Sequence, residues 1–403
     1  MIEKTRKDIF DHILRLCSLY ILIWTISPPL QHPIIYRGLG LIAGVLWVLI
    51  SWMKIGKLKT DVHGVYISIC LFCVFTIMIV WASGGGLVDA TVTQLQLIIL
   101  LLFVLQYAYY SQQDKDFIKV LTIVTFFCLS IWQIRTLIEY EINPGVSRLL
   151  VRSSDQAQYY AAQGVGGYGL IYPSIFTNAA LMYLFSKWKG LKKILLLIPL
   201  TIGILLVLSS GFLIAVVMTL VSLGGWLIGL FSRKNITAIL LSLIGLVAIA
   251  FLVINVLLKY SNEILQALDG TFYQRKVEEI ITALQTSEVT GKLEGRTSRY
   301  LESIIGMFKY PIIGAKILGL ESELGGHSTL LDLLGLFGVF SIGFYFAIGH
   351  VLKSIYQKAV HKGYVAAIIV LFLLNGILNT LVGSHGIIFI VVPGVILLAK
   401  TEN

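Results

Sequence analysis

The chain has 403 residues, of which 57% are hydrophobic and only 13% are charged, and its mean hydropathy is +0.88. A soluble domain has about 25% charged residues, so this composition excludes an ordinary soluble protein. The net charge is +10, but the basic residues form short clusters between apolar segments, which indicates membrane topology rather than binding of nucleic acid.

About twelve apolar segments are long enough to be predicted as membrane-spanning helices, since a span needs roughly 20 residues. They cover residues 13–30, 37–53, 63–82, 92–110, 117–138, 166–186, 193–208, 211–231, 236–258, 328–350, 364–382 and 385–399. The seventh and eighth leave only Ser209-Ser210-Gly211 for the turn between them. The first lacks a cleavage site, so we expect no removable signal. The predicted fold class is all-α, a polytopic membrane protein forming one integral domain over residues 1–403.

The distribution of lysine and arginine predicts that both termini are cytoplasmic, because short cytoplasmic connections retain positive charge. Only Arg37, in a short outer connection, opposes this arrangement. Two long connections, residues 139–165 and 259–327, are then outside, and connections of this length are usually functional or disordered. The second contains two amphipathic stretches, 272–284 and 297–310. We expect both to be helices that lie on the outer bilayer surface or cap a cavity between the spans.

Several kinds of chemistry are not expected. The sequence has no GxxxxGK[ST] phosphate loop and no metal-binding cluster, so we expect no nucleotide hydrolysis by that route, no metal and no cofactor. Cys70 and Cys73 have CxxC spacing but lie in an apolar segment without a second pair, which favours small buried residues. The predicted spans have few ionisable side chains in their middles, Asp332 near an outer end being the exception, which argues against ion-coupled transport.

Histidine is the first candidate for acid–base chemistry near neutral pH. In the predicted topology only His32, His327 and His385 are on the outer side. His327 follows Gly325-Gly326 at the point where the long loop enters a span. It would therefore lie at the membrane surface, above any cavity between the helices. The simpler interpretation is an interfacial histidine that is hydrogen-bonded to loop carbonyls.

Outer-face arginines are the second candidates, because a guanidinium binds phosphate through a planar fork of donors. They are Arg148 and Arg152 in the first long loop, and Arg275, Arg296 and Arg299 in the second. Arg296 and Arg299 are three residues apart in a predicted helix and would project to the same side. Such a cluster indicates either lipid headgroups or a specific anionic ligand, such as a pyrophosphate-linked lipid.

The residues between 294 and 346 form a recognisable series. It consists of Gly295-Arg296, Tyr300, Pro311-Ile312-Ile313-Gly314, Gly326-His327-Ser328-Thr329-Leu330-Leu331, Gly335 and Gly338. In order, spacing and membrane side, this series resembles the bacterial O-antigen polymerase and O-antigen ligase superfamily. Members have roughly twelve spans in a GT-C-like fold, with a "GR…W…P.xG" segment in a large outer loop and "HNxxL…G" entering the next span. The chain departs from this pattern at Ser328 (Asn in the family), at Tyr300 (Trp) and at Ser209-Ser210-Gly211-Phe212, near which many members have an arginine.

The resemblance implies glycosyl transfer at the outer face of the bacterial cytoplasmic membrane, without metal or nucleotide. Donor and acceptor would be undecaprenyl-pyrophosphate-linked oligosaccharides, and the product capsule, exopolysaccharide or O-antigen. By resemblance His327 is the general base and Arg296 holds the pyrophosphate. The second phosphate contact is expected from one of four further arginines, Arg148, Arg152, Arg275 and Arg299. Membrane lipids, a chain-length regulator and a flippase of the same pathway are the expected partners.

Three alternatives remain open at this point. A ligase of the same superfamily would transfer the glycan to lipid A core, which requires a lipopolysaccharide acceptor. A flippase or other transporter of lipid-linked oligosaccharides predicts polar groups deep in the spans. A non-catalytic membrane scaffold predicts no reaction at all.

Overall fold

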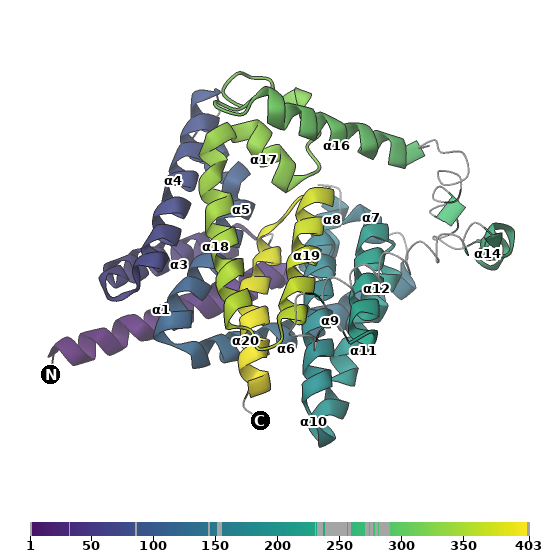
Figure 1. Cartoon of the computed structure of the whole chain (residues 1–403), viewed down its shortest axis with the longest axis horizontal. Helices are drawn as coiled ribbons and strands as arrows, with labels where there is room; N and C mark the ends of the chain where they lie inside the picture. The colour runs from purple at the N-terminus through teal and green to yellow at the C-terminus, as the bar shows by residue number, and fades with distance from the viewer. Residues whose placement is uncertain are drawn as a thin grey trace.

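The computed structural model describes residues 2–31, 33–84, 87–143, 146–150, 155–229, 259–270 and 291–400, with a few single positions between 231 and 281. This described part of the chain is helical and contains no strand (Figure 1). Its elements are α1 (Ile2–Ile26), α2 (Pro28–Gln31), α3 (Ile34–Met53), η1 (Ile55–Lys57), α4 (Thr60–Ala82), α5 (Leu87–Gln113), α6 (Lys115–Ile142), α7 (Val146–Leu149), α8 (Asp155–Ala162), α9 (Tyr168–Lys187), α10 (Gly190–Leu195), α11 (Leu197–Ser209), α12 (Leu213–Leu227), α14 (Ser261–Ala267), α16 (Gly291–Lys309), η3 (Glu321–Glu323), α17 (Thr329–Phe337), η4 (Gly338–Ser341), α18 (Ile342–Lys358), α19 (Lys362–Leu378), η5 (Gly383–Ile387) and α20 (Ile388–Lys400).

Eight helical stretches in the described residues are long and apolar enough to cross a membrane. They are Ile9–Ile26, Ile34–Met53, Thr60–Ala82, Gln94–Gln113, Lys115–Ile142, Gly190–Ser209, Thr329–Lys358 and Gly383–Lys400. Large apolar side chains on them are exposed, Phe127 by 67% for example, and such surface is stable only against lipid. The chain is therefore an all-helical, polytopic membrane protein.

The predicted spans coincide with described helices except for 236–258, which lies almost wholly outside the described residues. The count of twelve therefore stays a prediction. Two spans differ from expectation in their interiors. Residues 328–350 do not form one helix: α17 ends at a glycine, Gly338, whose φ of +54° lies outside the helical region, and α18 follows after η4. The last span begins with η5 before α20. The short turn after Ser209 is confirmed, since α12 begins at Leu213.

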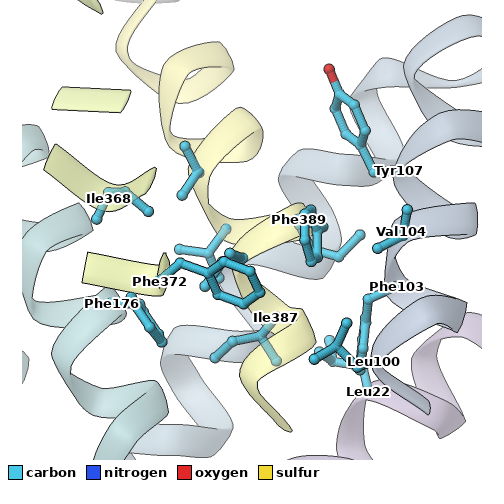
Figure 2. Packing of buried hydrophobic residues seen from close by; sticks show 14 of the residues in the cluster. Leu22, Leu100, Phe103, Val104, Tyr107, Phe176, Ile368, Phe372, Ile387 and Phe389 are labelled. Carbon is cyan, nitrogen blue, oxygen red and sulfur yellow. The ribbon is translucent and has the colours of Figure 1, made fainter. Parts of the chain in front are cut away.

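The core lies where α5, α9, α19 and α20 meet. Aromatic rings pack there: the ring centroids of Phe176 and Phe372 are 6.4 Å apart, and those of Phe372 and Phe389 are 5.7 Å apart (Figure 2). Phe103 from α5 is also fully buried in this cluster. Helix α9 is surrounded by protein along most of its length. Its polar Ser174 and Thr177 are buried, and their hydroxyl groups donate hydrogen bonds to carbonyls within the helix.

Helix α16 lies across one end of the bundle, next to α17, whereas the C-terminus lies at the opposite end (Figure 1). It confirms the helix predicted over 297–310. Ser303 on its inner side is fully buried, while Leu301, Ile305 and Phe308 are 57%, 53% and 73% exposed. An apolar face on an end-lying helix favours contact with the bilayer surface. The other amphipathic stretch, 272–284, falls almost wholly outside the described residues.

Candidate functional site

The loop between α16 and α17 is bound tightly to α17 through its backbone. Ala315 donates its N–H to the carbonyl of Gly335 at 2.8 Å, and Lys316 donates to the carbonyl of Leu336 at 3.1 Å. Gly314, the glycine of the "P.xG" series, has a φ of +84°. A Cβ at this position would collide with the carbonyl group of Leu336. The glycine is therefore needed for the loop to approach α17 this closely.

Replacing Gly314 by alanine is expected to destabilise the folded protein by more than about 2 kcal/mol, because a left-handed backbone costs an L-residue roughly 1–2 kcal/mol and the collision adds to it. The control is Gly319→Ala: Gly319 also has a positive φ, +69°, but nothing lies within 4 Å of its Cβ position. It should show only the conformational cost. Thermal unfolding in detergent measures both, and equal losses would show that the approach to Leu336 is unimportant.

The end of α16 is attached to the same loop by a carboxylate. Glu323 accepts hydrogen bonds from Lys309 at 2.6 Å and from the hydroxyl of Tyr310 at 2.5 Å. The Lys309 and Tyr310 hydrogen bonds hold the pKa of Glu323 below its usual value. A lowered carboxyl pKa contributes stability above the pKa of the unfolded chain, and this is lost as pH falls through the folded pKa. The attachment is therefore complete at neutral pH.

His327 lies half-buried between α16 and α17, facing Arg299. The Gly325 backbone passes so close to the carbonyl of Arg299 that a Cβ there would collide with it. A guanidinium N–H of Arg299 donates to Nε2 of His327. The other ring nitrogen, Nδ1, lies 3.1 Å from the carbonyl oxygen of Gly326. Because a guanidinium has no acceptor, a hydrogen bond between these two groups requires a lone pair on Nε2.

Asp332 in α17 fixes the position of α16 at this site. It is only 6% exposed, and its Oδ1 accepts from the hydroxyl of Ser303 at 2.5 Å while its Oδ2 accepts from the backbone N–H of Ser328 at 2.9 Å. Ser303 lies one turn after Arg299 on α16. The hydrogen bond between Ser303 and Asp332 therefore sets the rotation of α16 that presents Arg299 to His327. Asp332, the one ionisable group predicted inside a span, thus links α17 to α16.

The end of α19 and the residues after it are hydrogen-bonded to α16 and α17. The hydroxyl of Tyr300 donates to the carbonyl of Leu378 at 2.7 Å, and the backbone N–H of Leu381 donates to the hydroxyl of Thr329 at 2.7 Å. Ser328 caps α17 and also bonds to this region, with its hydroxyl 3.3 Å from the Gly376 carbonyl. Tyr300 and Ser328, two of the three departures from the superfamily pattern, thus join α16 and α17 to α19.

Of the five predicted arginines, the structure places one against His327, namely Arg299. Arg296 lies one turn earlier on α16, but its side chain is outside the described residues, as is that of Arg148 in α7. Arg152 and Arg275 lie outside the described residues altogether. The roles of these four residues stay predictions.

The topology predicts His385 on the outer side, and this stays a prediction. In the structure its side chain is fully buried in η5. Its ring centroid is 5.8 Å from that of Tyr172 and 6.4 Å from that of Phe176, both in α9. Nδ1 accepts from the N–H of Val382 at 2.9 Å. A topology derived from segment ends does not show this burial, because it does not place η5 within the helix bundle.

A cavity with a mixed polar and apolar lining lies near η5, and the sequence analysis did not predict it. Its volume is about 300 Å³, and Arg37, Gln31, Gln96, Trp24 and Ser384 are among its lining residues. Trp24 and Ser384 are buried, and neither the indole N–H nor the serine hydroxyl has a hydrogen-bond partner among the described residues. The signal that pointed here was Arg37, the basic residue that opposed the predicted topology; its Nε donates to the Gln31 carbonyl at 2.6 Å.

A scan against known protein families finds no match for this chain, and a search of the curated proteins finds none either. The resemblance of residues 294–346 therefore depends on the motif series itself. Among the described residues, no group of three histidine, cysteine or acidic side chains is arranged to hold a metal ion. What the site offers is a histidine ring nitrogen, a guanidinium beside it and hydroxyl groups around them.

Proposed function

We propose that this protein is a polysaccharide polymerase of the bacterial cytoplasmic membrane, which joins oligosaccharide repeat units linked to undecaprenyl pyrophosphate. The supporting observation is the contact of His327 with Arg299 of α16, a helix whose apolar face is suited to the bilayer surface. A neutral imidazole beside a guanidinium supplies a base for a sugar hydroxyl and a charge partner for a pyrophosphate leaving group. Their place at the lipid surface fits a substrate that is anchored in lipid.

In the proposed orientation both termini are cytoplasmic and the end with α16 faces outward. This orientation is supported by the lysines of the opposite end, such as Lys189, Lys192 and Lys353, since positive charge is retained on the cytoplasmic side. The same orientation brings α16 to the leaflet face where lipid-linked glycans would present their sugars. Capsule, exopolysaccharide or O-antigen synthesis follows as the proposed pathway class.

In the proposed reaction an acceptor hydroxyl transfers its proton to Nε2 of His327 while its oxygen forms a bond to the anomeric carbon of the donor sugar. The bond between that carbon and the pyrophosphate oxygen breaks, and undecaprenyl pyrophosphate leaves with the bonding electrons. The imidazolium of His327 then returns its proton to water. The new glycosidic bond extends the chain by one repeat unit.

Arg299 has a second role in this scheme. It donates to Nε2 of His327 in this structure, so the base is available to a hydroxyl only after the guanidinium turns away. The pyrophosphate of the donor is charged and can accept two hydrogen bonds from one guanidinium, so it is a stronger acceptor than a ring nitrogen. Donor binding would thus draw Arg299 to phosphate and expose the base in the same step. Arg296 is the proposed second fork, with Arg148, Arg152 and Arg275 as further phosphate contacts.

Reconstitution tests the function as a whole. Proteoliposomes containing the full chain and lipid-linked repeat units are expected to produce a ladder of polymer lengths, while liposomes without protein produce none. Transfer only to an added lipid A core would identify a ligase instead. Movement of the lipid-linked glycan between leaflets without polymer would identify a transporter, and no change in the substrate would contradict an enzymatic role.

A further inference from the structure

A second, strongly basic cavity lies at the end of the bundle opposite α16. It lies among the start of α4, the end of α5, the start of α6 and the last turns of α18, and its volume is about 790 Å³. Four lysines line it, namely Lys59, Lys115, Lys353 and Lys358, and Asp61 is the one acidic side chain in its lining. The proposed reaction at His327 makes no use of this cavity.

The four lysines lack anionic partners in the part of the chain that the structure describes: none of them forms an ion pair there. Lys358 instead lies over the ring of Tyr107, 5.6 Å from its centroid. Ammonium groups gathered around one cavity repel one another unless an anion lies between them. Topology explains lysines in the connections, but Lys353 and Lys358 belong to α18 and still face the same space as Lys59 and Lys115.

An apolar space adjoins the basic cavity. It has a volume of about 240 Å³ and shares Tyr107, Ser111, Lys115 and Lys358 with its neighbour. Its remaining lining is mostly apolar, with Ile118, Ile355, Pro393, Ile396 and Leu397, and with Lys400. Figure 2 shows the hydroxyl of Tyr107 pointing away from the phenylalanines of the core. The two cavities together have a cationic part and an apolar part, joined at Tyr107.

We propose that these joined cavities bind an anionic phospholipid of the leaflet on the side of the C-terminus. The phosphate group lies among the lysines, hydroxyl and amide groups such as those of Ser111 and Gln357 bind the rest of the headgroup, and part of an acyl chain follows the apolar lining. Basic pockets between transmembrane helices on the cytoplasmic side are typical sites for such headgroups. A soluble phosphate would fill the cationic part but would leave the apolar part empty. This site does not depend on the proposed polymerase activity.

Native mass spectrometry of the full chain in a neutral detergent tests the proposal, with phosphatidylglycerol titrated against phosphatidylcholine. We expect a clear preference for phosphatidylglycerol. The double variant Lys115→Gln, Lys358→Gln should weaken its binding about 25-fold, since each lysine near a lipid phosphate contributes roughly fivefold. The matched control is Lys189→Gln, Lys192→Gln, which removes two exposed lysines of the same end outside the cavity.

The control variant should bind as wild type does; an equal loss in both would show general attraction to charge and overturn the site. Leu397→Trp fills the apolar part without changing charge and should also weaken lipid binding severalfold. If Leu397→Trp binds normally, or if inorganic phosphate competes as effectively as the lipid, the phosphate alone is recognised and the lipid proposal fails. The unfolding temperature of each variant in the same detergent shows whether it has folded.

Discussion

Polymer formation is expected to fall by about 10²- to 10⁴-fold when His327 is replaced by alanine, which is the range that a positioned general base contributes. In the structure Nε2 of His327 faces the guanidinium of Arg299, and alanine removes this nitrogen. The measurement is the initial rate of repeat-unit joining in proteoliposomes. His12→Ala is the matched control, because His12 is exposed on α1, far from His327 in the sequence, and lines none of the cavities described above.

A third variant separates catalysis from packing. His327→Gln places an amide oxygen where it can accept from Arg299, but an amide cannot take a proton near neutral pH. If His327 is a base, the glutamine variant is as inactive as the alanine variant while its unfolding temperature stays at the wild-type value. Polymer formation close to wild type in His327→Gln would show that the residue only holds Arg299, and the catalytic assignment would be wrong.

The sequence predicted well those features that depend on a segment's own composition. Spans appeared as runs of apolar residues, and α16 appeared because Leu301, Ile305 and Phe308 recur at helical spacing. Helix breaks were harder: the interruption at Gly338 is set by contact with the loop around Gly314, which lies before α17 in the sequence. Residues 328–350 are apolar enough to be one helix, so composition alone does not show the break.

The partners within the site were predicted less well than its location. The Gly-Gly-His run at a loop-to-span junction placed His327, but the resemblance favoured Arg296 as its companion, while the described contact is with Arg299. Which arginine faces the histidine depends on the rotation of α16, and this is set by the hydrogen bond between Ser303 and Asp332, residues from two different helices. The lysine cavity was missed for the same reason, because its residues come from distant segments.

Arg299→Ala gives the second large expected effect, a loss of about 10²- to 10³-fold in rate, as for removal of one preorganised donor to a developing negative charge. The sign of this effect is informative. If Arg299 merely blocked Nε2 of His327, its removal would free the base and the rate would rise. A fall shows that the guanidinium is needed in the transition state. Arg299→Lys keeps the charge without the fork, so an intermediate rate would support paired contacts to phosphate.

Ser303→Ala tests whether the hydrogen bond to Asp332 acts through Arg299. Alone it should lower the rate by a smaller factor than Arg299→Ala, because α16 loses the contact that fixes its rotation but keeps the guanidinium. In the Arg299→Ala background it should have almost no further effect, since residues that act through one another are not additive. Full additivity of the two losses would contradict this, because Ser303 would then contribute to the reaction by a route that does not include Arg299.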